Sequence, residues 1–187
     1  MNSNLFTGQL VRLAALDAEA SAEQFARWDR DMEYMRLLDS DPRRLLTAKQ
    51  VKAEIEKQEA AGQEIAFAIR TLADDQMIGF VDLDGISWPH GDSFAGIGIG
   101  ERAYRGKGYG TDAMRVLMRY AFTELNLFRV SLNVFSYNQR AIRSYEKAGF
   151  VIEGCQRQAL RRDGQNHDLI FMGVLREDWL RTINNDQ

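Results

Sequence analysis

The sequence predicts a mixed α/β or α+β domain, a sheet with helices packed on its faces. Three observations lead to this fold class. Strand-like and helical segments alternate along the chain, which is typical of a sheet covered by helices. The chain has 187 residues, of which 45% are hydrophobic and 27% charged, an ordinary globular composition. Its two prolines, Pro42 and Pro89, mark breaks, and no linker, repeat or low-complexity tract is present. We therefore expect residues 1–187 to form a single domain.

The first third of the chain predicts one strand and two helices. Gln9–Ala15 is typical of a short strand. Apolar residues in Asp17–Trp28 recur at helical spacing, so we predict a helix there. Thr47 is a suitable N-cap for a charged helix that runs to Ala61, and Gly62 is a suitable residue to end it.

Beyond residue 64, strands and helices interleave more regularly. Asp74-Asp75 and Asp163-Gly164 have the residue types of tight turns. The earlier segment Met32–Pro42 fits neither a strand nor a helix pattern. We predict strands at Ile65–Thr71, Met77–Leu83, Phe94–Gly100, Arg129–Phe135 and Phe150–Gly154, helices at Thr111–Glu124 and Gln139–Ala148, and a hairpin over Leu160–Leu175.

Charge, cysteine content and apolar runs argue against several classes. The net charge is −3 with basic residues scattered, so we expect no nucleic-acid surface. No run approaches about 18 apolar residues and no secretory signal is evident, so we expect a cytoplasmic protein without membrane contact. The single Cys155 cannot form an internal disulfide. His90 and His167 lie far apart, so we expect no metal site.

The segment Gly96-Ile97-Gly98-Ile99-Gly100 alternates strictly. Side chains on a strand point alternately to opposite faces, so one face carries the two isoleucines and the other only hydrogen atoms. Glycine weakens a strand, so three glycines on one face indicate that something approaches the backbone closely. The residues leave two candidates open, a bound ligand and a tightly packed helix.

The next segment, Arg105-Gly106-Lys107-Gly108-Tyr109-Gly110, leads into an amphipathic helix. Glycines let successive N–H groups point into one concavity, and a helix N-terminus carries about half a positive charge. Such a loop binds phosphate, and the arginine and lysine add full charges. An ordinary glycine-rich turn is the alternative.

Two common nucleotide-binding motifs do not fit this loop. A Walker loop needs a hydroxyl residue after its lysine, whereas Lys107 is followed by Gly108. A dinucleotide fingerprint needs an acidic residue at the end of the next strand, and Arg129–Phe135 contains none. The sequence therefore argues against an NTPase and against a hydride-transfer enzyme.

Further motifs follow the loop: Tyr120-Ala-Phe122, Leu125-Asn-Leu127, Asn138-Gln-Arg-Ala141-Ile142, Tyr145-Glu-Lys-Ala-Gly149-Phe150, Glu153-Gly154, Arg162-Asp-Gly-Gln and Asp168. With R-x-x-G-x-G between a strand and a helix, they resemble the GNAT superfamily of N-acetyltransferases. The similarity is to its RimJ/RimL branch and to the spermidine acetyltransferases. The resemblance implies a mostly antiparallel central sheet, splayed where acetyl-CoA binds. It places the acetyl-CoA core in residues 93–176 and the acceptor site mainly in residues 1–92.

By the same resemblance, a primary amine attacks the acetyl thioester directly in a ternary complex. Tyr145 corresponds to the family's proton donor for the leaving thiolate, and a purely structural position in the core is its alternative role. Asn138 corresponds to a cofactor contact, and helix capping is its alternative role. Cys155 is a poor nucleophile candidate, and we expect it to be a small buried hydrophobe. The residues implied to bind the cofactor are Gly98, Ile99, Gly100, Arg105, Gly106, Lys107, Gly108, Tyr109, Gly110, Asn138 and Tyr145.

The acceptor and its base are less defined. The glutamate that some relatives carry before the loop is absent here, because the corresponding stretch is Ala95-Gly96. Acceptors consistent with the family are a protein N-terminus, a polyamine, an amino sugar or another small metabolite, and a homodimer is a further expectation. The rival interpretation is a non-catalytic acyl-CoA sensor or partner-binding module. By position, base candidates are Asp82, Asp84 and Glu101, and the alternative for each is a solvated charge at a strand end. Aromatic candidates for the acceptor pocket are Trp28, Tyr34 and Trp88, and a core position is the alternative for each.

Overall fold

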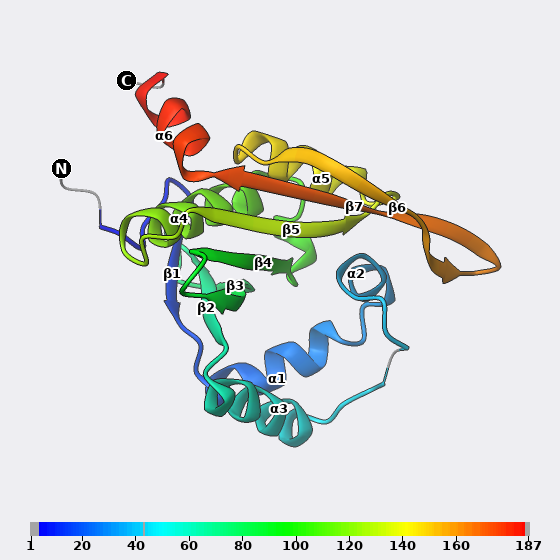
Figure 1. The fold of residues 1–187 in the computed structure, drawn as a ribbon. Coiled ribbons are helices and arrows are strands. Elements are labelled where there is room, and N and C mark those ends of the chain that lie inside the picture. Colours follow the sequence, from blue (N-terminus) through cyan, green and yellow to red (C-terminus); the bar gives the residue numbers. More distant parts are fainter. Residues whose placement is uncertain (1–3, 43, 186–187) are drawn as a thin grey trace.

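A seven-stranded sheet in the order β1-β2-β3-β4-β5-β7-β6 frames the molecule in a computed structural model that describes residues 4–42 and 44–185 (Figure 1). Neighbouring strands are antiparallel except β4 and β5, which run parallel. The predicted mixed, mostly antiparallel sheet is therefore confirmed. The strands are β1 (Val11–Ala15), β2 (Glu64–Thr71), β3 (Met77–Ser87), β4 (Asp92–Ile99), β5 (Arg129–Phe135), β6 (Val151–Arg162) and β7 (Gln165–Leu175).

Helices cover both faces of the sheet. Ile69 and Ala68 are neighbours on β2 and point to opposite faces. Ile69 belongs to the large core beneath α4, whereas Ala68 packs with residues of α1 and α2. The helices are α1 (Ala18–Trp28), α2 (Met32–Leu38), α3 (Ala48–Ala61), α4 (Tyr109–Thr123), α5 (Gln139–Lys147) and α6 (Arg176–Asn185), with a short 3-10 helix at Arg102–Tyr104.

The two parallel strands separate after a short contact. β4 pairs with β5 only between residues 92–94 and 129–131, although the strands continue to Ile99 and Phe135. From residue 95 on, the edge of β4 that faces β5 has no strand partner. The splay that the family resemblance implied is therefore present.

Local capping explains why several predicted helix boundaries are confirmed. The Asp17 carboxylate accepts a hydrogen bond from Ala20 N–H and starts α1. Thr47 and Gln50 form a reciprocal capping box at the start of α3. Gly62 ends that helix with a left-handed φ of 65°, a conformation that glycine adopts without steric penalty.

Four features differ from the sequence-based expectation. Residues 32–38, which fitted no pattern, form α2, and α6 follows the last predicted strand. β6 runs without interruption from Val151 to Arg162, and a bulge near Gln158 (φ 55°) accounts for the two separate segments that we predicted. Cys155 lies on β6 and is exposed, so the expectation of a buried hydrophobe is wrong.

Candidate active site

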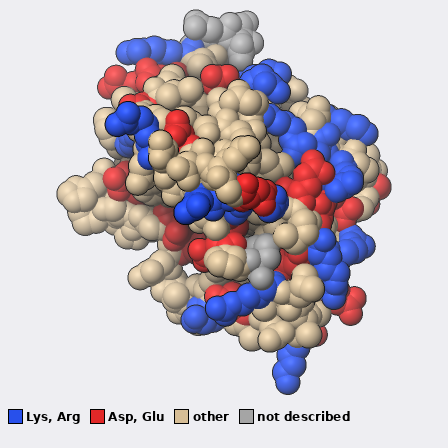
Figure 2. Space-filling model, turned by 90° about the vertical axis from the view of Figure 1, so that its right-hand side faces the viewer, with Lys and Arg blue, Asp and Glu red and all other residues tan. Residues whose placement is uncertain are grey.

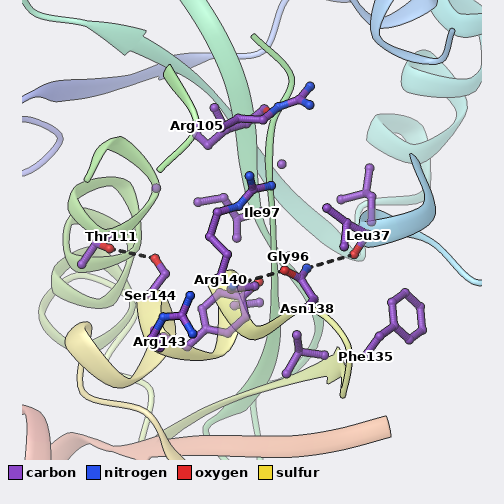
Figure 3. Close-up of a pocket in the computed structure, with 18 of the residues that line it drawn as sticks. Leu37, Gly96, Ile97, Arg105, Thr111, Phe135, Asn138, Arg140, Arg143 and Ser144 are labelled. Carbon is purple, nitrogen blue, oxygen red and sulfur yellow. Dashed lines mark hydrogen bonds between the residues drawn. The ribbon is translucent and has the colours of Figure 1, made fainter. Parts of the chain in front are cut away.

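A cavity of about 630 Å³ opens where β4 and β5 separate. Its walls include residues 96–99 of β4 and residues 133–135 of β5. The loop after β4 and one side of α5 complete it (Figure 3). The predicted glycine loop, the splayed strand and the predicted Tyr145 therefore lie around one space.

The loop between β4 and α4 presents its backbone to this cavity. Gly106 and Gly108 line it and have φ values of 73° and 91°, which favour glycine. α4 begins at Tyr109, and the first turn of a helix leaves N–H groups without intrahelical acceptors. The N–H of Asp112 already bonds to Gly108 O at 2.9 Å, so any remaining donors precede it. These N–H groups lie at the helix N-terminus, where the helix dipole stabilises a bound anion.

Three cationic side chains of α5 line the same cavity. Arg140, Arg143 and Lys147 are three and four residues apart, so they share one side of the helix. Figure 3 shows the guanidinium groups of Arg140 and Arg143 rising from α5 along the cavity. Within the described part of the chain, none of the three has an ion-pair partner. Together with the loop, they form a site suited to a ligand with several negative charges.

Arg105 lines the cavity, but its guanidinium group is paired with an acidic side chain and bonded to backbone carbonyls of the protein itself. Its Nε donates to Ile99 O at 2.8 Å, its Nη1 pairs with Asp31 Oδ2 at 2.9 Å, and its Nη2 donates to Gly100 O. The guanidinium also lies 4.9 Å from the centre of the Tyr34 ring. Burial alone would raise the pKa of Asp31, but hydrogen bonds from Tyr34 N–H and Arg105 lower it. The charge that we expected at the phosphate is thus paired with Asp31.

Two other loop residues that we expected at the cofactor, Lys107 and Tyr109, lie outside the cavity lining. The Lys107 side chain is exposed and lies outside the cavity lining. Tyr109 packs edge-on against Tyr104, with ring centroids 5.0 Å apart. The cations at the cavity wall are therefore Arg105, which is paired with Asp31, and the three of α5, and not the predicted Lys107.

Aromatic side chains cover the glycine face of β4. A Cβ built on Gly100 would collide with the Trp28 ring, and one built on Gly98 would collide with the Tyr34 hydroxyl. Both aromatic residues are buried, and Tyr34 also lines the cavity. Of the two candidates that the sequence left open, packed helices fill this face, and the β5-facing edge of β4 remains accessible to a ligand. Trp88 is exposed and lies outside the cavity.

Tyr145 and Asn138 line the cavity from α5. Asn138 Oδ1 accepts from Ala141 N–H at 3.2 Å, and Nδ2 donates to Leu37 O at 3.4 Å (Figure 3), so its capping role is confirmed. Burial, together with the nearby charge of Asp82, raises the pKa of Tyr145 to about 12. The Tyr145 hydroxyl therefore stays protonated near neutral pH and can donate a hydrogen bond.

The three carboxylates proposed as bases differ in their hydrogen bonds, exposure and position relative to the cavity. Glu101 accepts hydrogen bonds from Gln24 Nε2 at 2.7 Å and Trp28 Nε1 at 3.0 Å, so it is structurally engaged. Asp84 is exposed and accepts from Gly85 N–H. Asp82 is only 8% exposed and lines the cavity.

A second cavity of about 360 Å³ lies between α1, α3 and the β2–β3 pair. It shares Asp82 and Asp84 with the first cavity. Its other walls are largely apolar, from residues such as Phe25 and Ile55, and no Lys or Arg is among its described lining residues. The acidic residues that line it are Asp29, Glu54, Glu64, Asp82 and Asp84.

The two cavities therefore differ in charge. The first is lined by four cations, Arg105, Arg140, Arg143 and Lys147, besides the shared Asp82 and Asp84, whereas the charged residues described in the lining of the second are all acidic. On the molecular face drawn in Figure 2, acidic and basic side chains are intermixed. The separation of charge is thus a local property of the two cavities.

Across residues 4–42 and 44–185, no three His, Cys, Asp or Glu side chains are grouped closely enough to hold a metal ion. None of the described helices is long and apolar enough to cross a bilayer.

Comparison with known proteins agrees with this geometry. The profile of the family described as Acetyltransferase (GNAT) domain matches residues 10–151. The chain belongs to the GNAT acetyltransferase family. One relative, the probable N-acetyltransferase YjcK of Bacillus subtilis (strain 168), is 36% identical over 117 residues, which are 62% of this chain and 64% of the relative.

A second relative has a named acceptor. The spermidine N(1)-acetyltransferase of Escherichia coli (strain K12) is 35% identical over 107 residues, 57% of each chain. The matched region thus spans less than two thirds of either curated relative. The crystal structure of spermidine N-acetyltransferase from Vibrio cholerae in complex with CoA and spermine superposes with a TM-score of 0.82. It covers 91% of this chain and 98% of the other at 24% identity, which confirms the GNAT fold.

Part of this candidate site was not predicted from the sequence. The cations of α5 carry a detectable signal, since positions 140, 143 and 147 share one helical side. The second cavity has no comparable signal in the sequence, because its walls come from segments that are far apart along the chain.

Proposed function

We propose that this protein transfers an acetyl group from acetyl-CoA to a primary amine by direct attack in a ternary complex. The observation that supports the proposal most is the pair of adjoining cavities with opposite charge, which share Asp82 and Asp84. A coenzyme A diphosphate suits the cationic cavity, and an ammonium group suits the acidic one. Family membership and the RimJ/RimL resemblance agree with this assignment.

We assign the cofactor to the cavity between β4 and β5. The loop 105–110 would cradle the diphosphate, with Arg140, Arg143 and Lys147 supplying charge. The unpaired edge of β4 would hydrogen-bond the pantetheine arm near residues 98–100. Asn138 would lie against that arm while it caps α5. When bound, acetyl-CoA supplies the reactive thioester.

Tyr145 would act as the proton donor of the reaction. The leaving thiolate of coenzyme A has a pKa near ~8.5, and a protonated phenol can donate to it. Tyr145 is partly buried on the cavity side of α5, and its raised pKa keeps the proton in place. No protein nucleophile is needed, and the exposed Cys155 lies outside the cavity lining.

The second cavity favours an aliphatic amine with more than one positive charge. Its acidic residues would bind ammonium groups, and its apolar walls would contact the methylene chain between them. Polyamines have this chemistry, and the names of two relatives above point the same way. Residues 1–92 would thus supply most of the acceptor site and residues 93–176 the cofactor site, within one functional domain.

A two-part experiment tests the proposal. Thermal unfolding is measured with acetyl-CoA, ATP and NAD, because a ligand at about 100 times its dissociation constant stabilises by about 2.7 kcal/mol. Thiol release is then followed with polyamines, amino sugars, amino acids and N-terminal peptides. We expect selective stabilisation by acetyl-CoA and turnover with polyamines. Cofactor binding without turnover on any amine would favour the acyl-CoA sensor instead.

A further inference from the structure

Asp82 occupies the space that a side chain at position 96 would otherwise take. Asp82 on β3 pairs with Gly96 on β4 in the antiparallel register. A Cβ built on Gly96 would lie 2.7 Å from Asp82 Oδ1 and 2.8 Å from Oδ2, closer than real atoms approach. The absence of a side chain on β4 is therefore what admits the carboxylate of the neighbouring strand.

This carboxylate stands at the boundary of the two cavities. Asp82 lines both of them and is 8% exposed. In the described residues it has no Lys or Arg partner. The charged groups around it are acidic: Glu64 from β2 and Asp84 from its own strand, with Tyr145 approaching from α5. Asp29 and Glu54 line the cavity on the far side.

We propose that Asp82 is the catalytic base, the group that takes a proton from the acceptor's ammonium ion as the amine passes from the acidic cavity toward the thioester. The assignment rests on the proposed acetyltransferase function. An amine of pKa ~10.4 is neutral about once in 10³–10⁴ at pH 7, so it needs such a base. A buried carboxylate that lacks a cation partner is suited to that task.

The protons balance as follows for an ammonium acceptor. The nitrogen first gives one proton to Asp82 and attacks the acyl carbon as a neutral amine. The new C–N bond forms and the C–S bond breaks, and the sulfur takes the proton of Tyr145. The nitrogen loses its second proton, which restores the Tyr145 hydroxyl. Asp82 then releases its proton to water, so the products are the amide, the thiol and one proton.

The electrostatic surroundings fit this role. Burial and, to a smaller extent, the charges of Glu64 and Asp84 outweigh the lowering effect of the Gly96 N–H and raise the pKa of Asp82 to about 7. A base with a pKa near the working pH combines a large ionised fraction with useful proton affinity. The wild-type rate should therefore fall below about pH 7 and level off above it.

Asp82→Asn tests the assignment, because it removes the base and keeps the shape beside Gly96. We expect kcat/KM for the amine to fall about 10²–10⁴-fold at pH 7, with acetyl-CoA affinity unchanged. Without the base, the reaction depends on amine that is already neutral. The rate of the variant should then rise about tenfold per pH unit between pH 6 and 9. A purely structural role would lower the rate equally at every pH.

Two further variants keep the test decisive. Gly96→Ala should displace the carboxylate and reproduce the loss of turnover with Asp82 still present. Asp75→Asn, an exposed turn residue outside both cavities, is the matched control and should behave as wild type. If Asp82→Asn keeps the wild-type rate and pH profile, the base assignment is wrong while the acetyltransferase proposal stands. If the wild type binds acetyl-CoA and acetylates no amine, the proposed function itself is wrong.

Discussion

The guanidinium of Arg105 joins three parts of the chain at the end of β4. It bonds to the carbonyls of Ile99 and Gly100 and to Asp31, which precedes α2. Its side chain is 5% exposed, so these bonds are shielded from water. An arginine is suited to this position because its planar group reaches several acceptors at once. The same residue that looks like a phosphate ligand in the sequence therefore fixes the loop that would bind the phosphate.

Replacing Arg105 with Met should destabilise the fold. The change leaves two carbonyls and Asp31 without their donor, and breaking such buried contacts costs about 2–4 kcal/mol. Arg102→Met is the matched control, because Arg102 contacts the same carboxylate at 3.2 Å but is 70% exposed. An exposed pair contributes about 0–1 kcal/mol. Urea unfolding compares the stability of the two variants. Equal stability would contradict the role of Arg105 in holding Ile99, Gly100 and Asp31 together.

Tyr145→Phe should separate chemistry from binding. The phenol is protonated near neutral pH because burial raises its pKa to about 12, so its loss removes a proton donor and little volume. We expect kcat to fall about 10²–10⁴-fold with unchanged acetyl-CoA affinity, measured by thiol release and calorimetry. Tyr120→Phe, a partly buried tyrosine outside the cavity lining, should retain full turnover. Normal kcat in Tyr145→Phe would remove Tyr145 from the mechanism.

At the scale of elements, the glycine loop works through backbone conformation. Gly108 immediately precedes α4 with a φ of 91°, a region that a β-branched residue adopts only with strain of about 1–3 kcal/mol. Gly108→Val should therefore reshape the start of α4 and strongly weaken acetyl-CoA binding, as measured by calorimetry. Gly164→Val is the control, because Gly164 in the β6–β7 turn has a φ of 74° and no close neighbours. Wild-type affinity in Gly108→Val would refute the loop assignment.

The elements also show where sequence patterns suffice. α1 and α3 were predictable because their caps are local: Asp17, Thr47 and Gly62 act within a few residues. α2 was not, because contacts more than 100 residues away help to place it. Tyr137 Oη donates to Arg36 O, and Arg162 Nη2 donates to Asp39 O. No local periodicity contains that information.

At the scale of the whole molecule, the sheet brings together groups that the sequence keeps apart. The loop and Tyr145 were predictable because each lies within a motif. The role of Asp82 depends on its register with Gly96 and on its place between two cavities, which only the folded sheet defines. The prediction from sequence therefore covered the proposed cofactor cavity better than the proposed acceptor cavity.

The buried Asp82 should also make the stability of the whole molecule depend on pH. Its folded-state pKa of about 7 lies above the ordinary value of 3.8, so the folded protein holds a proton that the unfolded chain releases. The stabilising contribution is complete below about pH 4 and is lost as the pH rises through 7. Asp31, Glu153 and Asp163 have lowered pKa values, so their effects are complete before pH 5.

Urea unfolding of the wild type and Asp82→Asn at pH 5 and pH 8 isolates this contribution. Asparagine carries no charge at either pH. The variant therefore does not lose the folding stability that the wild type loses as Asp82 ionises. The variant should therefore gain stability relative to the wild type between pH 5 and pH 8. Asp75→Asn should show no such change, because that carboxylate is exposed and paired with Arg12. An equal difference at both pH values would mean that Asp82 ionises in the folded protein as it does in the unfolded chain.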